Sequence, residues 1–350
     1  MTPRPDLVVA GAGPVGLACA IEARMGGMDV VVVEPRGEPI DKACGEGLMP
    51  GALAALHRIG VDPAGSPITG IAYLDGRLRV EHRFAERAGR GVRRTVLQAA
   101  LAERARELGT RFVRGKVTAL HPHPDGVGLD LSGSHVVDLE TPWLIAADGL
   151  HSPLRRMAGL ERRPQPAARR RFGVRRHYLV EPWTDLVEVH WSSQVEVYVT
   201  PVDDRTVGVA VLGPRPLDQD AAVAAIPLLA DRLRGARPAG DVRGAGPLLQ
   251  RTQARTSGRV LLAGDASGYV DALTGEGMRV GFAQARAAVA AVRTGDTEQY
   301  ERAWRATTRD FRMLTSALVM AARSPVRDRI VPTAARRPAW FGSVVERLSR

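Results

Sequence analysis

The strongest constraint on the fold is a glycine-rich turn near the start of the chain. The sequence Gly-Ala-Gly-Pro-Val-Gly at 11–16 follows a short apolar run, Leu7–Ala10, and precedes the small apolar residues of 15–24. A second apolar run, rich in valine, occupies 29–34. Strand, tight turn, helix and strand in this order are typical of a βαβ unit, because two parallel strands need a crossover helix between them. The chain is therefore expected to begin as an α/β fold.

Each glycine of this turn has a role that suits a bound dinucleotide. Gly11 permits the tight turn, Gly13 lets the backbone approach a pyrophosphate, and Gly16 allows the helix to pack closely on the strand. The pyrophosphate charge then lies at a helix N-terminus. Glu34 ends the second strand, about 20 residues further on, where a carboxylate accepts hydrogen bonds from an adenosine ribose. The motif predicts a dinucleotide but does not distinguish FAD from NAD.

Two further motifs place acidic residues after apolar strands. Asp148-Gly149 follows one predicted strand, and Ser152-Pro153 then offers a helix N-cap and first turn. Gly264-Asp265 follows another predicted strand in the same way. The carboxyl ends of parallel strands are where α/β sheets bind ligands. We therefore expect both motifs to contact one ligand.

The remaining pattern predicts a discontinuous first domain with a second domain inserted into it. Residues 68–84 alternate like a hairpin around Asp75-Gly76, and 171–212 predict four successive antiparallel strands. Helices are expected at 50–59, 93–108, 218–235, 275–293 and 298–322, and further strands at 111–117, 127–131, 136–139, 143–146 and 259–263. The predicted boundaries are 1–66, 88–168 and 250–297 for the dinucleotide-binding domain, 67–87 and 169–249 for a substrate-binding β-sheet domain, and 298–350 for a C-terminal helical segment.

The composition argues against several classes of function. The formal net charge is +11, but Lys42 and Lys116 are the only lysines and the arginines are spread along the chain. No nucleic-acid-binding signature accompanies this charge, so we expect no nucleic-acid partner. The two cysteines are too few for a disulfide framework, and Cys19 is expected in the core of the first helix. The eight histidines have no metal-ligand spacing, so no metal site is expected.

The chain is expected to be cytoplasmic. No apolar run reaches the roughly 18–20 residues that span a bilayer, and the first apolar stretch runs into a glycine loop rather than a cleavage site. Arginines at 323–337 precede Trp340-Phe341, which leaves open a weak peripheral contact with an anionic membrane surface. The favoured alternative is a solvated basic helix that packs on the body of the protein. The oligomeric state is not indicated.

The three motifs together resemble the flavoprotein family of para-hydroxybenzoate-hydroxylase-type monooxygenases and geranylgeranyl reductases, over most of residues 1–300. In that family all three motifs serve one FAD in a glutathione-reductase-type Rossmann domain. The resemblance implies that Arg94 lies against the FAD phosphates and that Val117 lies beside the adenine. The residues expected at FAD are Gly11, Gly13, Pro14, Val15, Gly16, Glu34, Pro35, Arg36, Cys44, Gly45, Arg94, Val117, Ala147, Asp148, Gly149, Gly264, Asp265, Gly275, Glu276, Gly277 and Met278.

Two loops resemble the reductase branch of this family. Thr-Gly-Glu-Gly at 274–277 is similar to geranylgeranyl reductases, whereas Gly268 and Ala272 stand where the hydroxylases have His and Pro. The resemblance implies a helix opening at 275–278 whose N–H groups face the flavin N1–C2=O edge. Glu276 is then expected to be an acid at the helix start rather than a catalyst. Cys44-Gly45 resembles a Cys-Gly pair near the flavin ring, where Cys44 either shapes the pocket, donates a proton or is simply a packed thiol.

The inserted domain offers candidates for contact with a substrate. Strand alternation predicts one polar, ring-bearing face, made of Glu196, Tyr198 and Thr200 on one strand and Glu188, His190 and Ser192 on the strand before it. This face either lines a pocket or meets solvent. Tyr198 and His190 join Cys44 as candidate catalytic residues. The aromatic substrate motif of the prenyl reductases is mostly absent around Tyr198, apart from Pro201.

These observations predict an FAD-dependent oxidoreductase that NAD(P)H reduces transiently, because no second dinucleotide motif is present. The reduced flavin is expected to reduce a C=C bond in a mid-sized hydrophobic or polyfunctional molecule. The alternative is a monooxygenase, which hydroxylates or epoxidises its substrate through a C4a-hydroperoxyflavin. A more distant alternative is a dinucleotide-binding module without enzyme activity.

Overall fold

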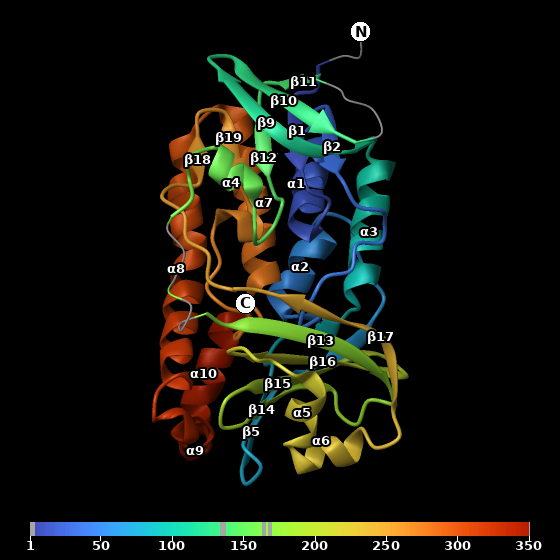
Figure 1. The fold of residues 1–350 in the computed structure, drawn as a ribbon, viewed down its shortest axis with the longest axis vertical. Coiled ribbons are helices and arrows are strands. Elements are labelled where there is room, and N and C mark those ends of the chain that lie inside the picture. Colours follow the sequence, from blue (N-terminus) through green and yellow to red (C-terminus); the bar gives the residue numbers. More distant parts are fainter. Residues whose placement is uncertain (1–3, 134–137, 163–165, 167–169, 350) are drawn as a thin grey trace.

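The structure, a computed structural model, describes residues 4–133, 138–162, 166 and 170–349. In Figure 1 a layered α/β part lies above a broad sheet, and helices run along one side of both. The strands are β1 (Leu7–Ala10), β2 (Val30–Glu34), β3 (Gly47–Leu48), β4 (Ser66–Ile68), β5 (Gly70–Leu74), β6 (Arg79–Arg83), β7 (Gly89–Gly91), β8 (Arg111–Arg114), β9 (Lys116–His123), β10 (Gly126–Ser132), β11 (Asp138–Thr141), β12 (Leu144–Ala146), β13 (Phe172–Leu179), β14 (Leu186–Trp191), β15 (Glu196–Asp203), β16 (Thr206–Gly213), β17 (Arg237–Ala245), β18 (Thr256–Ser257) and β19 (Val260–Leu262). The helices are α1 (Pro14–Met25), α2 (Pro50–Arg58), α3 (Arg94–Glu107), α4 (Pro153–Met157), α5 (Gln219–Ala224), α6 (Pro227–Arg232), α7 (Gly277–Thr294), α8 (Thr297–Ala322), α9 (Ile330–Arg336) and α10 (Pro338–Ser349), with short 3₁₀ turns η2 (Gly264–Ser267) and η3 (Arg327–Arg329).

A six-stranded sheet with the order β18-β19-β12-β1-β2-β8 forms the centre of the α/β part. Strand β1 pairs in parallel with β2 and β12, and β12 pairs in parallel with β19. Each of these four strands is buried along its whole length, as expected for a parallel sheet that is covered on both faces. Helices α1, α3 and α7 cover one face, and the small sheet β11-β10-β9 covers the other.

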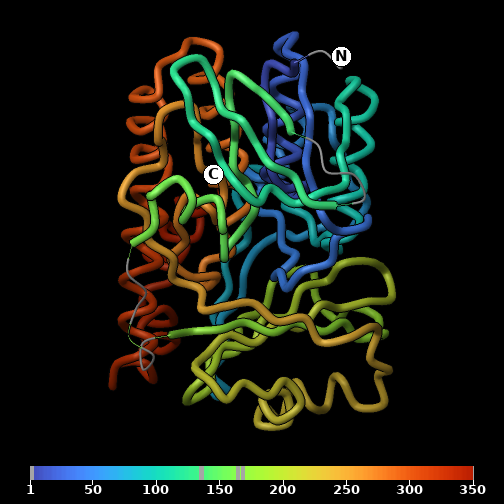
Figure 2. The backbone as a smooth tube through the Cα atoms, turned by 45° about the horizontal axis from the view of Figure 1, so that its top comes forward, coloured from blue at the N-terminus to red at the C-terminus, as the bar shows by residue number. Residues whose placement is uncertain are grey.

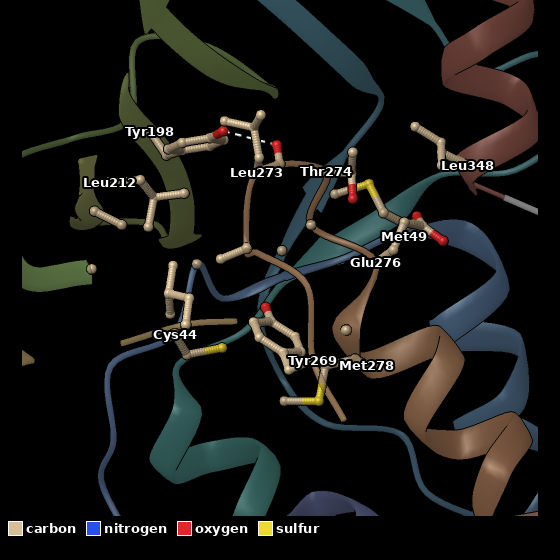
Figure 3. A pocket seen from close by; sticks show the side chains of 18 of the residues that line it. Cys44, Met49, Tyr198, Leu212, Tyr269, Leu273, Thr274, Glu276, Met278 and Leu348 are labelled. Atoms are coloured by element: carbon tan, nitrogen blue, oxygen red, sulfur yellow. Dashed lines mark hydrogen bonds between the residues drawn. The ribbon is translucent and has the colours of Figure 1, made fainter. Parts of the chain in front are cut away.

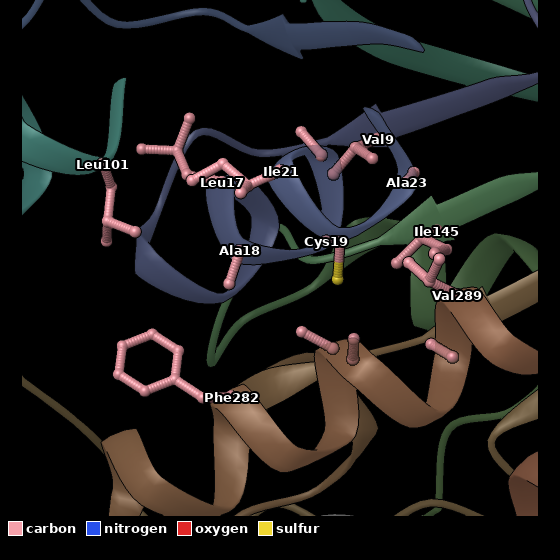
Figure 4. Packing of buried hydrophobic residues seen from close by; sticks show 14 of the residues in the cluster. Val9, Leu17, Ala18, Cys19, Ile21, Ala23, Leu101, Ile145, Phe282 and Val289 are labelled. Carbon is pink, nitrogen blue, oxygen red and sulfur yellow. The ribbon is translucent and has the colours of Figure 1, made fainter. Parts of the chain in front are cut away.

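Small residues allow α1 and α7 to approach each other closely. Figure 4 shows Cys19 of α1 facing α7, with Phe282 and Val289 on the opposite helix. Cys19 has no exposed surface, which confirms its predicted place in the core, and burial raises the pKa of its thiol. Gly281 of α7 has to be glycine, because a Cβ there would lie 2.5 Å from a methyl group of Val15. This packing fixes the glycine turn against the start of α7.

The second large sheet has seven strands in the order β17-β13-β16-β15-β14-β5-β6. Four of its neighbouring pairs, from β17 to β14, are antiparallel, whereas β5 pairs with β14 in parallel. Its strands come from two separate stretches of the chain, 70–83 and 172–245. Helices α5 and α6 cover one face through a valine-rich cluster, so the other face is left for the pocket described below.

The C-terminal helices connect the two parts. In Figures 1 and 2 the dark orange and red helices α8 to α10 extend along one side of the molecule from the six-stranded sheet to the seven-stranded sheet. Helix α10 packs on β6, where Glu346 accepts hydrogen bonds from the Ala85 N–H and pairs with His82. Within the described ranges, no helix combines the length and the apolar character needed to cross a bilayer.

Most predicted elements are present, and the exceptions have clear causes. The helix predicted at 218–235 is divided into α5 and α6, because Pro227 lacks the N–H that a continuous helix would use. Strand β17 was not predicted, since it is an exposed edge strand without apolar alternation. The single strand predicted at 111–117 is two strands of different sheets: β8 ends at Arg114, and β9 extends from Lys116 to His123. The strand predicted at 136–139 lies partly outside the described residues, and β11 begins at Asp138.

Candidate functional site

A cavity of about 960 Å³ lies between the two large sheets and the C-terminal helices. Its walls differ in chemistry. At one end are the glycine turn and charged side chains, which we call the cofactor half: Gly13, Lys42, Arg94, Asp148 and Asp265. At the other end are the seven-stranded sheet and helices α8, α9 and α10, which we call the substrate half. Figure 3 gives a close view of the region where the halves meet.

The glycine turn has the geometry that its sequence predicted. Gly11 has a φ of +109°, and a Cβ there would lie 2.5 Å from the Ala147 carbonyl oxygen. At Gly16 a Cβ would lie 1.9 Å from the Gly11 carbonyl oxygen. Gly13 differs, because its nearest neighbour is the Arg94 guanidinium at 3.8 Å and it faces the cavity together with Pro14 and Val15. Gly11 and Gly16 are therefore required by close backbone contacts within the fold, whereas Gly13 leaves its backbone accessible from the cavity.

The two acidic motifs meet at the same edge of the six-stranded sheet. Asp148 follows β12, and its Oδ2 accepts a hydrogen bond from the Leu154 N–H at 3.2 Å. Its Oδ1 is buried without a partner among the described residues, and burial raises its pKa. The predicted helix start at Ser152-Pro153 is confirmed, because the Ser152 hydroxyl accepts from the Arg155 N–H at 2.9 Å. Asp265 follows β19 and opens onto the cavity.

The two cations of the cofactor half, Arg94 and Lys42, form no ion pair with a described residue, although Asp148 and Asp265 lie in the same half. Arg94 is 5% exposed, and its Nη1 has no hydrogen-bond partner in the described part of the chain. Burial, together with the nearby Arg36, holds the pKa of Arg94 and of Lys42 below their usual values. Lys42 was not among the predicted site residues, and nothing in its sequence context marks it. This half is therefore suited to an anionic group.

The loop at 42–47 is held by a buried network that the sequence analysis missed. Glu46 has a φ of +61°, and its carboxylate accepts hydrogen bonds from the Arg94 N–H at 2.8 Å and from His177 Nε2 at 2.6 Å. His177 Nδ1 lies 3.2 Å from Arg175 Nη1, which only donates, so Nε2 carries the His177 proton. Glu46 and Arg175 both line the cavity. The one sequence signal was an acid between two glycines, at Gly45-Glu46-Gly47.

Cys44 lies at the junction of the two halves. Its Sγ accepts a hydrogen bond from the Glu46 N–H at 3.4 Å. Burial raises the pKa of the thiol, and so does the carboxylate of Glu46, so the thiol is neutral at neutral pH. In Figure 3 the sulfur points toward the ring of Tyr269. Burial strongly raises the pKa of Tyr269, whose hydroxyl has no hydrogen bond to any described residue.

Tyr198 and His190 lie on opposite faces of the seven-stranded sheet, so the expectation that they share one face was wrong. In the register of β14 and β15, Val189 pairs with Tyr198 and His190 pairs with Val197. Tyr198 and Thr200 line the cavity, whereas His190 is buried near Glu188, 3.3 Å from its Oε2, on the other face. Tyr198 donates its hydroxyl proton to the Leu273 carbonyl at 2.8 Å.

The loop before α7 is shaped by glycines and by one unusual acid. Gly275 has a φ of +70°, and Gly275, Gly277 and Met278 all line the cavity. Helix α7 starts at Gly277, two residues later than predicted. Glu276 is its N-cap residue, but the side chain does not cap the helix. It pairs with Arg279, its Oε1 has no partner among the described residues, and burial raises its pKa to about 7.

The substrate half is lined almost entirely by apolar side chains. The sheet supplies Ile71, Tyr73, Val187, Val189, Ala210 and Leu212, and the helices supply Leu314, Leu318, Ile330, Phe341, Val345 and Leu348. Alternate residues on neighbouring strands point to one face of a sheet, and the pairing of Val187 with Ile71 and of Val189 with Tyr73 follows this rule. The face predicted from sequence to be polar and ring-bearing is thus mainly apolar. Its exceptions are Tyr198 and Thr200 and, among the charged residues, Arg175 and the buried Glu196.

Comparison with known proteins decides the family. The model of the FAD binding domain family matches residues 4–299. The chain belongs to this family. It is therefore an FAD-dependent oxidoreductase, as the resemblance in the sequence predicted.

The relatives of this flavoprotein include reductases and monooxygenases. A menaquinone reductase of Mycolicibacterium smegmatis is 29% identical, over 87% of this chain and 80% of its own. A digeranylgeranylglycerophospholipid reductase of Methanothermobacter thermautotrophicus is 27% identical, over 85% and 81%. A 12-dehydrotetracycline 5-monooxygenase/anhydrotetracycline 6-monooxygenase of Streptomyces rimosus is 28% identical, over 81% and 61%. The structure of the flavin-dependent brominase Bmp2, as a triple mutant, superposes with a TM-score of 0.86 at 17% identity, over 99% of this chain and 94% of that one, which shows a common fold.

The residues of the cofactor half fit FAD. The unpartnered Arg94 guanidinium lies beside Gly13, so the pyrophosphate would supply the negative charge that this buried cation lacks. The free Oδ1 of Asp148 and the open carboxylate of Asp265 would accept hydrogen bonds from hydroxyl groups. When bound, FAD supplies hydride-transfer chemistry to the junction where Cys44 lies.

Other expected FAD contacts lie farther from the cavity. Val117 is buried in the cluster between β9 and β2 and does not line the cavity. Glu34 ends β2 as predicted, but its Oε2 accepts from the Ala12 N–H and Arg36 binds both carboxylate oxygens. Arg36 holds the pKa of Glu34 below its usual value, against the effect of burial. Pro35 and Arg36 are exposed. The ribose and adenine contacts therefore stay predictions. Across the described ranges, no group of three His, Cys, Asp or Glu side chains is arranged to hold a metal.

Proposed function

We propose that this protein is an FAD-dependent reductase that adds hydrogen across a C=C bond of a largely apolar molecule, with NAD(P)H as the reductant. The observation that carries the proposal is the continuous cavity: its cofactor half passes directly into a substrate half lined by aliphatic and aromatic side chains. A hydrocarbon chain gains free energy by leaving water for such a surface. The reductases among the relatives, which act on menaquinone and on a digeranylgeranyl lipid by their names, support this substrate class.

The side chains at the junction suit the supply of a proton. Hydride addition to one carbon of a C=C bond has to be matched by a proton at the other carbon. Tyr269 and Cys44 both face the cavity at this point, and both have raised pKa values, so both are protonated at neutral pH. They are therefore donors rather than bases. We assign the role first to Tyr269, because its hydroxyl has no hydrogen bond to a described residue and is free to turn toward a substrate. Cys44 is the second candidate, since the bond that its Sγ accepts from the Glu46 N–H leaves the S–H free to donate.

Tyr198 has a different role in this proposal. Its hydroxyl donates to the Leu273 carbonyl and so holds the loop that leads to Gly275 and Glu276. Thr200 acts similarly on the other side, since its hydroxyl donates to the Gly45 carbonyl at 2.9 Å. Both residues position backbone segments around the flavin site. In this proposal Tyr198 therefore positions the loop instead of taking the catalytic part that the sequence predicts for it. His190 has no role in it, because this residue lies on the other face of the sheet.

The activity is tested by anaerobic turnover of the FAD-loaded protein with NAD(P)H and an isoprenoid quinone. We expect a product with two added hydrogens, one of which becomes deuterium when the solvent is D₂O. The monooxygenase among the relatives defines the competing outcome. Substrate-dependent oxygen consumption with an oxygen atom in the product, and no anaerobic turnover, would replace the reductase by a monooxygenase.

The proton donor is tested by comparing Tyr269→Phe with Tyr198→Phe. Removing a general acid typically costs about 10²-fold or more in rate, so we expect Tyr269→Phe to lower kcat by about that factor while NAD(P)H still reduces the flavin at the wild-type rate. Tyr198→Phe loses a buried hydrogen bond worth about 1 kcal/mol, so its main effect is expected on thermal stability and KM. Stopped-flow reduction and steady-state kinetics separate the two. A Tyr269→Phe enzyme with wild-type kcat would return the role to Cys44, which Cys44→Ala then tests.

A further inference from the structure

The cavity opens to the outside between the C-terminal helices. Several residues that line it are also exposed. Four of them lie in the segment 326–340, and we call these four the mouth: Val326, Arg329, Thr333 and Trp340. Val326 is 47% exposed and Trp340 is 57% exposed. Directly behind them lie Phe341 and Ala334, which are buried and also line the cavity. The mouth therefore presents apolar surface to water at the entrance of an apolar chamber.

Hydrogen bonds of Arg327 to the seven-stranded sheet fix the chain segment that carries Val326 and Arg329. Arg327, between two mouth residues in sequence, is buried and binds Glu196 of the seven-stranded sheet at 2.6 Å. The same guanidinium donates to the carbonyls of Ser192 and Val195. Val326 is next to this anchored residue, so its exposed side chain is held at the opening. Trp340 lies on α10, where the adjacent Phe341 is buried against the ring of Tyr73, with ring centroids 5.0 Å apart.

The surroundings of the mouth are strongly basic. Between residues 323 and 340 the chain has five arginines, and Asp328 is the one acid. Arg329, Arg336 and Arg337 are exposed, and none has an ion-pair partner within the described residues. An exposed tryptophan beside unpaired arginines matches the interface of an anionic bilayer, where the ring lies at the headgroup level and the guanidinium groups bind phosphates. An ordinary solvated helix would not need an exposed tryptophan and an exposed valine at the same opening.

We propose that the mouth docks on the surface of an anionic lipid bilayer, with Trp340 and Val326 at the interface and Arg329, Arg336 and Arg337 against the phosphates. Docking in this way lets an apolar chain pass from the bilayer into the substrate half without crossing water. The passage of a substrate rests on the proposed function, whereas the docking itself does not.

The test uses the full-length, FAD-loaded protein in flotation with vesicles, without substrate. We expect binding to vesicles of 3:1 phosphatidylcholine to phosphatidylglycerol, little binding to phosphatidylcholine alone, and release at high salt. Arg336→Glu combined with Arg337→Glu should weaken binding at least tenfold, and so should Trp340→Glu. The matched controls are Arg286→Glu combined with Arg293→Glu on α7, which make the same charge change elsewhere, and Leu228→Glu on α6, an equally exposed apolar residue.

The controls should float like the wild type. Three outcomes would overturn the proposal: wild-type protein that stays in the aqueous fraction with anionic vesicles, mouth variants that float as well as the wild type, or self-association without lipid that Trp340→Glu abolishes, which would assign the mouth to a second copy of the chain. Because flotation is scored without turnover, its failure leaves the reductase proposal standing, and absent C=C reduction leaves the docking result standing.

Discussion

The two halves of the cavity are built in opposite ways. The cofactor half consists of short loops at strand ends, and its key groups are glycines and charged side chains with at least one atom that has no hydrogen-bond partner among the described residues. The substrate half consists of the flat face of one sheet and the sides of three helices, and nearly all its groups are apolar. The cofactor half has a buried cation that needs an anionic ligand to neutralise its charge. Among the described residues, the substrate half has no such buried unpaired cation, and its shape is set by the packing of the sheet and the helices that form it.

This contrast predicts different consequences of mutation. In the cofactor half a substitution either creates a clash with the backbone or removes a charge that has no partner. A clash with the backbone lowers stability, whereas a removed charge lowers FAD affinity, so the two effects can be measured separately. In the substrate half a change acts through shape and burial, so it lowers stability, by about 2–5 kcal/mol for a buried aliphatic side chain cut to alanine, and leaves FAD affinity nearly unchanged. The predictions below test that separation.

The largest effect is expected at Gly16, with Gly13 as its counterpart. An alanine Cβ at 16 would lie 1.9 Å from the Gly11 carbonyl oxygen, so Gly16→Ala should lower the free energy of unfolding by more than about 4 kcal/mol or prevent folding. At Gly13 a Cβ meets nothing closer than 3.8 Å, so Gly13→Ala should fold normally but bind FAD weakly, because the methyl group occupies the approach of the pyrophosphate. Chemical denaturation and FAD titration measure the two quantities.

A matched control exists for this pair. Gly37 has no neighbour within 4 Å of a built Cβ, so Gly37→Ala should change neither quantity. If Gly13→Ala bound FAD like the wild type, the pyrophosphate would not lie at this turn. If Gly16→Ala were as stable as Gly37→Ala, the close contact between helix α1 and Gly11 of the turn would not matter for folding.

The next effect is expected at Arg94, where affinity and stability should change in opposite directions. Arg94→Met removes a buried cation whose Nη1 has no partner, so the protein without FAD should be equally stable or more stable. FAD affinity should fall about 100-fold, which corresponds to about 2.7 kcal/mol, because charge-assisted hydrogen bonds to phosphate are lost. Arg93→Met is the control, since Arg93 is the adjacent arginine but does not line the cavity. A loss of stability without a loss of affinity would make Arg94 a structural residue.

The cofactor half could be predicted in detail because its determinants are local in sequence. The glycines at 11, 13 and 16 form one short motif, and Asp148 and Asp265 come directly after the ends of buried strands, although the atoms closest to Gly11 and Gly13 belong to Ala147 and Arg94. Even so, Glu46 was missed, because its partner His177 is 131 residues away and on another sheet. The predicted contacts at Val117 and Glu34 depend on where adenosine lies and remain predictions.

The substrate half could not be predicted to the same degree, since it depends on register and docking. Alternation within β14 or β15 was clear from sequence, but which residues of the two strands share a face depends on pairing Val189 with Tyr198. A shift by one residue would have placed His190 in the cavity. The contribution of α8 to α10 was also unpredictable, because their position depends on side-chain contacts such as Thr274 with Thr315 and Arg327 with Glu196.

The smallest effect is expected at Glu276, where the two halves meet. Burial raises its pKa to about 7 from an ordinary value of 4.5, so the folded protein favours the protonated form. The stability that this preference contributes is present at low pH and is lost as pH rises from about 4.5 through about 7. Glu276→Gln keeps the shape and removes the proton equilibrium. Relative to the wild type, the variant should therefore gain about 1 kcal/mol in the free energy of unfolding between pH 6 and pH 8, measured by denaturation of FAD-saturated protein.

Glu298→Gln, at an exposed acid on α8, should show no such gain. A constant difference across this pH range would mean that Arg279 keeps Glu276 ionised throughout, and the junction between the halves would then carry a fixed charge rather than a neutral acid.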